Sequence, residues 1–133
     1  MGRGRPSALG RALIVDDEYM VALDLVAAMT ALGFETCEIV ASVRAAQSAA
    51  MENAPDLVIM DINLAGGREG IEAARWLREV CGAPIVFITS YADDDTVSRI
   101  NEQVPGAPVL SKSDYRERLP AALASVLPAA RQL

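Results

Sequence analysis

Residues 56–61, Asp-Leu-Val-Ile-Met-Asp, decide the predicted fold. Four apolar residues between two carboxylates are typical of a short strand buried on both faces of a parallel sheet. Three further apolar runs also end in polar residues: 13–15 before Asp16 and Asp17, 85–88 before Thr89, and 109–110 before Ser111 and Lys112. The carboxyl ends of parallel strands meet at one edge, where ligands bind. We therefore expect three carboxylates, a hydroxyl and a lysine to converge on one site.

Helical patterns alternate with these runs. The first helix is predicted from Glu18 to Leu32 and the second from Val43 to about Asn53. The third follows a glycine-rich loop at residues 65–70. The fourth runs from about Asp93 to Asn101, and the fifth ends at about Leu127. The third helix is expected to bury Ala73, Ala74, Leu77, Val80 and Cys81. A second strand is expected at about residues 38–41, with Ser42 capping the helix after it. Five alternating strands and helices predict an α/β fold, a three-layer α/β/α sandwich with right-handed crossovers.

Length and composition limit the possible functions. The chain has 133 residues, a net charge of −6 and no histidine. This suits one domain at residues 12–128, between a flexible arm at 1–11 and a tail at 129–133. The charge argues against non-specific nucleic-acid binding, and the lack of histidine excludes catalysis by Ser/His/Asp or Cys/His groups. No apolar stretch is long enough to span a membrane, and two isolated thiols, Cys37 and Cys81, suit a reducing cytoplasm.

The expected carboxylates suggest a bound cation. Asp16, Asp17 and Asp61 would repel one another and raise one another's pKa unless a positive charge lay among them. An oxygen-rich site without histidine or cysteine favours a hard ion, Mg²⁺ or Mn²⁺.

These motifs together resemble one family, the receiver domain of bacterial two-component response regulators. The resemblance runs from Leu13 to about Leu127 and rests on four motifs: Ile14-Val15-Asp16-Asp17-Glu18, residues 56–61, Ile88-Thr89-Ser90-Tyr91 and Leu110-Ser111-Lys112. It implies a flavodoxin-like (βα)5 fold with strand order 2-1-3-4-5, which places the first and third strands side by side.

The resemblance also implies roles in metal binding. Asp17 and Asp61 would be direct ligands of the metal, and Asp16 would hold a metal-bound water. The backbone carbonyl of Asn63, two residues after Asp61, would be a further ligand.

The same resemblance implies a phosphoacceptor switch. Asp61 would be the nucleophile that takes a phosphoryl group from a histidine kinase or histidine phosphotransferase, with Lys112 and Thr89 binding the transferred oxygens. The protein would catalyse only its own phosphotransfer and dephosphorylation, so it is not expected to be an enzyme. Because the chain ends after the fifth helix, we expect a stand-alone receiver that acts through protein contacts or as an intermediate or sink in a phosphorelay. It is expected to be cytoplasmic, as a monomer or a phosphorylation-dependent dimer.

Two positions depart from the family pattern. Ser113 replaces the proline that usually follows the lysine in a cis bond, and a cis bond before a non-proline residue costs roughly 3–4 kcal/mol. We therefore predict a trans Lys112–Ser113 bond or a strained loop. Val109 replaces the usual aromatic switch residue, so movement of residues 89–101 is expected to transmit the signal instead. Tyr91 would either substitute as the moving aromatic or flank the site and control the access of water.

Other interpretations stay open. The same fold without phosphorylation would make a pseudo-receiver that only binds partners. An aspartyl phosphohydrolase would need a second acid where Asn63 stands, and acidic strand ends would repel the phosphate of a flavin. Taken singly, residues 16–18 are as well explained by capping of the first helix, Thr89 or Ser90 by capping of the fourth, and Lys112 by a surface position. The run 93–95 is expected to form the first turn of the fourth helix.

Overall fold

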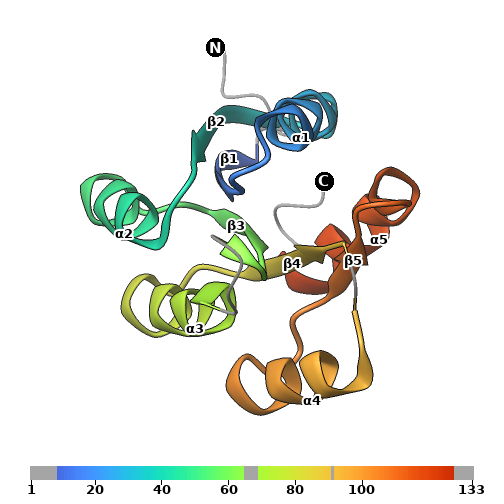
Figure 1. Cartoon of the computed structure of the whole chain (residues 1–133). Helices are drawn as coiled ribbons and strands as arrows, with labels where there is room; N and C mark the ends of the chain where they lie inside the picture. The colour runs from blue at the N-terminus through green and yellow to red at the C-terminus, as the bar shows by residue number, and fades with distance from the viewer. Residues whose placement is uncertain (1–8, 65–68, 91, 128–133) are drawn as a thin grey trace.

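The computed structural model describes residues 9–64, 69–90 and 92–127. Five parallel strands form one sheet in the order β2-β1-β3-β4-β5, as predicted. The strands are β1 (Gly10–Val15), β2 (Phe34–Val40), β3 (Leu57–Asp61), β4 (Ile85–Thr89) and β5 (Val109–Ser111). The helices are α1 (Tyr19–Ala31), α2 (Val43–Glu52), α3 (Glu69–Cys81), α4 (Asp94–Gln103) and α5 (Tyr115–Val126). In Figure 1 the helices lie on both faces of the sheet, so that helices, sheet and helices form three layers. Among the described residues, no helix is long and apolar enough to cross a membrane.

Each face of the sheet has its own apolar core. α1 and α5 cover one face, where Leu25, Met29 and Leu119 pack on Ile14 and Ile59. α2, α3 and α4 cover the other face and pack on the alternate residues of the same strands. All five residues of β3 and of β4 are buried, which agrees with their continuous apolar runs. The polar groups at the ends of these strands are therefore held by the most buried part of the molecule.

Two strand boundaries differ from the prediction. β1 begins at Gly10, so the expectation of a flexible arm through residue 11 is wrong for its last two residues. Leu9 also donates a backbone hydrogen bond to Gly33, at 2.9 Å. β2 begins at Phe34, four residues before the predicted start, because the chain enters the sheet directly after Gly33 ends α1 with a φ of 117°.

The helix starts test the capping predictions. Ser42 caps α2, since its hydroxyl accepts from the backbone N–H of Ala45 at 3.1 Å. The cap of α4 is Asp93, whose carboxylate accepts from the N–H of Thr96 at 2.7 Å. The alternative that Thr89 or Ser90 caps this helix is therefore wrong. Asp94 and Asp95 form the first turn of α4, as predicted.

α3 departs from the prediction at both ends. It begins at Glu69, so Gly70 is helical and buried and does not belong to the preceding loop. A Cβ atom on Gly70 would lie 2.2 Å from the carbonyl oxygen of Asp61. Glycine thus allows the first turn of α3 to pack against the end of β3. Near the other end, Val80 is 52% exposed, so its predicted place in the core is wrong.

Candidate functional site

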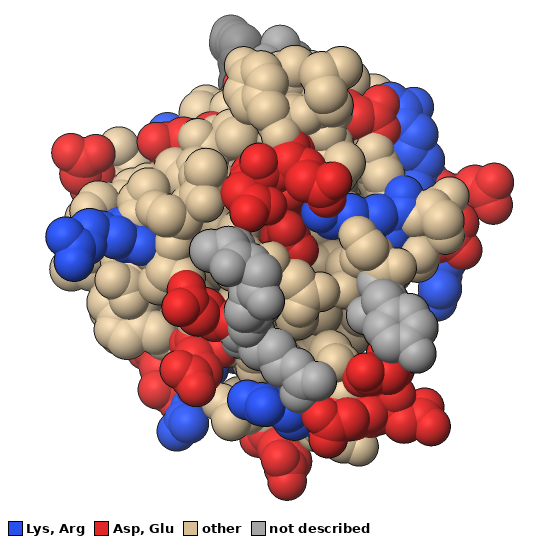
Figure 2. Space-filling model, viewed as in Figure 1, with Lys and Arg blue, Asp and Glu red and all other residues tan. Residues whose placement is uncertain are grey.

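The carboxylates of Asp16, Asp17 and Asp61 form one cluster at the carboxyl edge of the sheet. β1 and β3 are paired with Val15 opposite Met60, so the residues that follow these positions meet. One oxygen from each carboxylate lies within 4.8 Å of the others. Asp16 and Asp61 are buried, whereas Asp17 is exposed. In Figure 2, acidic side chains gather near the ends of β1 and β3, with basic side chains beside them.

The cluster fits a hard divalent cation. Asp16 Oδ2 is buried and accepts no hydrogen bond from the described residues, although Lys112 Nζ lies 3.4 Å away. Burial raises the pKa of Asp16 to about 6; a hydrogen bond from the Glu18 amide opposes this, and the nearby Asp61 carboxylate adds to it. A buried carboxylate oxygen without a donor, beside two other carboxylates, is what a bound cation would satisfy. These oxygens suit Mg²⁺ or Mn²⁺.

Asn63 connects the acidic cluster to Thr89. Its backbone N–H donates to Asp61 Oδ1 at 3.2 Å, and its side-chain amide donates to Thr89 Oγ1 at 3.3 Å. Thr89 is the last residue of β4 and is fully buried. The sequence assigned only a carbonyl to Asn63, and that role stays a prediction. The contact of its side chain with Thr89 was not foreseen.

Lys112 reaches across the edge into the cluster. Its backbone N–H donates to the carbonyl of Thr89 at 2.8 Å, which fixes the start of the side chain beside β4. Its ammonium lies 3.3 Å from Asp61 Oδ2 and 3.4 Å from Asp16, and it also donates to Glu18. The interpretation of Lys112 as a surface lysine is therefore wrong, since its side chain is only 11% exposed.

Charge balance explains the state of this lysine. Burial lowers the pKa of Lys112, but the hydrogen bond to Glu18 and the Asp61 and Asp16 carboxylates outweigh it, so the pKa lies above its usual value. The ammonium is thus held charged within the cluster. From sequence, Glu18 belongs to the motif of residues 14–18 and has helix capping as an alternative role, but it is assigned no contact in the site. Glu18 is the N-cap residue of α1, but its side chain makes no capping hydrogen bond.

After β5, Ser113 stands where the family pattern has proline, and it forms hydrogen bonds with Ser111. No peptide bond among the described residues is cis, so the Lys112–Ser113 bond is trans, as predicted. The backbone N–H of Ser113 donates to Ser111 Oγ at 3.1 Å, and the two hydroxyls lie 2.8 Å apart. Val109 packs on the core formed with α2, α3 and α4. Tyr91, the predicted substitute for the missing aromatic, lies outside the described residues.

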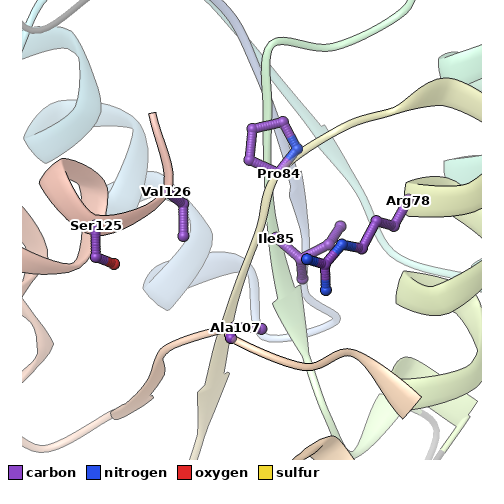
Figure 3. Close-up of a pocket in the computed structure, with 7 residues that line it drawn as sticks. Arg78, Pro84, Ile85, Ala107, Ser125 and Val126 are labelled. Atoms are coloured by element: carbon purple, nitrogen blue, oxygen red, sulfur yellow. The ribbon is translucent and has the colours of Figure 1, made fainter. Parts of the chain in front are cut away.

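The hollows at the opposite edge offer less chemistry. One of about 260 Å³ is lined by Arg78, Pro84, Ile85, Ala107 and Ser125 among others, near the start of β4 (Figure 3). Arg78 already donates to the carbonyl of Pro105 at 2.7 Å, and the Ser125 hydroxyl donates to that of Ala122 at 2.7 Å. These polar groups therefore already have hydrogen-bond partners within the protein.

Another hollow lies at the carboxyl edge of the sheet. It has a volume of about 500 Å³, lies between α1 and β2, borders the acidic cluster and includes Asp16, Asp17 and Tyr19.

Known proteins with similar sequences are response regulators. Residues 12–124 match the model of the response regulator receiver domain. The chain is 31% identical over 111 residues to the transcriptional regulatory protein PdtaR of Mycobacterium tuberculosis, covering 84% of this chain and 54% of that protein. It is 33% identical over 82 residues to the phyllosphere-induced regulator PhyR of Methylorubrum extorquens, covering 61% and 31%. The chain thus spans about half or less of the length of these relatives.

Solved structures of similar fold are receiver domains. The signal receiver domain of a modulated diguanylate cyclase from Desulfovibrio desulfuricans is 29% identical, with a TM-score of 0.77 over 88% of this chain and 92% of that one. A response regulator receiver protein from Sinorhizobium medicae is 28% identical, with a TM-score of 0.75 over 92% and 97%. With the match over residues 12–124, these findings show that the chain belongs to the response regulator receiver domain family.

Proposed function

We propose that this receiver is a phosphoacceptor switch and that Asp61 accepts the phosphoryl group. The observation that carries the proposal is the position of Asp61, which is 3% exposed and lies beside both the aspartates that follow β1 and the ammonium of Lys112. A buried carboxylate beside both a cation-binding cluster and an ammonium is placed to attack an anionic phosphoryl donor.

In the proposed step, an oxygen of Asp61 forms a bond to phosphorus as the phosphorus–nitrogen bond of a phosphohistidine breaks. The bonding electron pair leaves with the imidazole nitrogen. Lys112 and Thr89 stabilise the oxygens of the transferred group, since each already lies at the edge of the cluster. A bound Mg²⁺, held directly by Asp17, Asp61 and the carbonyl of Asn63 and through a water by Asp16, would neutralise charge on the transferring oxygens. Hydrolysis of the acyl phosphate would then reset the switch, with no other substrate turned over.

The signal would leave through the strands that bind the phosphoryl group. Thr89 ends β4 and Lys112 follows β5, so engagement of both would pull on the segments that lead into α4 and α5. A charged group added at this edge would bias the surface formed by α4, β5 and α5 towards a second arrangement. We propose that this surface, in the cytoplasm, binds a downstream protein, and that a histidine kinase or histidine phosphotransferase supplies the phosphate.

A pseudo-receiver is the second candidate. It is favoured by Val109, which takes the place of the aromatic switch residue, and by Ser113, which takes the place of proline. The three aspartates, Thr89 and Lys112 lie together nevertheless, and a module that only binds partners has no need of this arrangement.

Intact-mass measurement separates the two candidates. The protein is incubated with acetyl phosphate, with and without Mg²⁺, beside the variants Asp61→Ala and Asp94→Ala. The second variant removes an exposed carboxylate from the first turn of α4 and is the matched control. We expect one added phosphoryl group in the wild type and in Asp94→Ala, only with Mg²⁺, and none in Asp61→Ala. No addition to the wild type would support the pseudo-receiver.

A further inference from the structure

Glu18 is a partner of Lys112 that the proposed phosphoryl chemistry does not use. The Lys112 ammonium contacts three carboxylates, those of Glu18, Asp16 and Asp61. An ammonium has three N–H donors, so these contacts can use all of them. A phosphoryl oxygen that binds Lys112 must therefore displace one of the three carboxylates.

The three carboxylates differ in what their release would cost. The side chains of Asp16 and Asp61 are 0% and 4% exposed, so each would lose a cationic neighbour in a place that water barely reaches. The side chain of Glu18 is 57% exposed, so water can solvate its carboxylate as soon as the ammonium leaves. Glu18 is therefore the partner that is released most easily.

Glu18 also differs in its relation to the cation cluster. That cluster contains Asp16, Asp17 and Asp61 but not Glu18. A divalent cation there would neutralise most of the charge on the aspartates and weaken their hold on Lys112. Glu18 would then be the main anion that competes with a phosphoryl group for the ammonium.

Resting on the proposed function, we propose that Glu18 is a positioning residue that holds Lys112 in the resting site and competes with the phosphoryl group for it. The contact keeps the lysine beside Asp61 before phosphate arrives. It also weakens the bound state, because Lys112 must leave Glu18 to engage a phosphoryl oxygen. The identity of residue 18 therefore sets how tightly this receiver holds phosphate.

The test measures binding of beryllium fluoride, a non-covalent mimic of the phosphoryl group, by NMR titration at saturating Mg²⁺. Glu18→Gln keeps the shape of the side chain but removes the charge, and we expect about three- to tenfold tighter binding, the size of an exposed charge interaction of about 1 kcal/mol. Glu18→Asp keeps the charge on a shorter side chain. If the contact to Lys112 is the cause, this variant also binds more tightly than the wild type.

Glu52→Gln is the matched control, since it removes the same charge from an exposed residue at the end of α2, and it should bind the mimic as the wild type does. Equal or weaker binding by Glu18→Gln would overturn the inference while leaving the proposed function intact. Tightening by Gln but not by Asp would assign the effect to charge alone and overturn the positioning role. If the wild type binds no mimic and gains no phosphoryl mass, both proposals are wrong.

Discussion

The two halves of the carboxyl edge carry opposite chemistry. The ends of β1 and β3 bring together the carboxylates of Asp16, Asp17 and Asp61, whereas the ends of β4 and β5 supply the hydroxyl of Thr89 and the ammonium of Lys112. The first half suits a cation and the second an anion. Lys112 crosses from the second half into the first and serves as its counter-ion. Under the proposed function this lysine would have two roles, and a phosphoryl group that binds it would have to displace one of its carboxylate partners.

Of the changes to either half, removing Lys112 should have the largest effect on the free energy of unfolding. Lys112→Met leaves the buried carboxylates of Asp16 and Asp61 without their ammonium, and we expect a loss of about 3 kcal/mol in the free energy of unfolding without divalent ions. Mg²⁺ should restore much of this stability, because the metal replaces the missing charge. Denaturant unfolding with and without Mg²⁺ measures both effects.

Asp17→Asn is the opposite change, made in the first half. It relieves repulsion in the cluster, so stability without metal should not fall, while Mg²⁺ affinity should drop by about tenfold or more, equal to about 1.4 kcal/mol. Asp17 is exposed, so its replacement leaves no cavity. If both variants changed stability in the same direction, the division of the edge into a cationic and an anionic half would be wrong.

Gly70→Ala disturbs the first half of the edge, at the end of β3. The added Cβ would lie 2.2 Å from the Asp61 carbonyl oxygen and 2.9 Å from Ile62 Cα, both backbone atoms. We expect a loss of about 1–3 kcal/mol by overpacking, reduced by the better helix propensity of alanine, and slower phosphorylation because Asp61 shifts. Glu69→Ala, exposed in the same turn, should change stability by less than about 0.5 kcal/mol. Thermal unfolding and acetyl phosphate labelling report the two effects.

The first half was the easier half to predict from sequence. Its carboxylates follow apolar runs whose strand type was clear, and the strand order then places them together. The need for glycine at position 70 was hidden, because the close approach of α3 to β3 depends on packing between segments that sequence patterns do not specify.

The second half and the edge strand were harder. The sequence assigned Asn63 to the site only as a metal ligand and gave Glu18 no contact there, and only the folded chain shows that Glu18 contacts Lys112 and Asn63 contacts Thr89. The one available signal was that a buried lysine needs acceptors for its donors. The start of β2 was missed because, among the described strands, β2 lies at the edge beside β1 and exposes Glu35 and Thr36, so its first residues lack the apolar run of a central strand.

The smallest predicted effect concerns a contact between α5, which follows β5, and α1, which follows β1. Tyr115 donates to the carboxylate of Asp24, which also accepts two hydrogen bonds from Arg116 at 2.9 Å. Burial and the hydrogen bond to Asp24 raise the pKa of Tyr115 to about 12. The stability from this contact should be complete below the ordinary tyrosine pKa of about 10 and be lost as the pH rises through about 12.

Tyrosinate absorbance against pH measures this titration. Tyr115→Phe should remove the late-titrating group, and Asp24→Asn should bring the pKa of Tyr115 down. An ordinary tyrosine titration in the wild type would show that the contact does not join α1 to α5 in solution.

The most direct test of the account is to locate the phosphoryl group. After incubation with acetyl phosphate and Mg²⁺, borohydride reduction converts an aspartyl phosphate to homoserine, and tandem mass spectrometry of the tryptic peptide 45–68 reads positions 52, 56 and 61 separately. The proposed function predicts homoserine at position 61 and aspartate at position 56. Homoserine at any other carboxylate, or at none although the protein has gained phosphate, would contradict it.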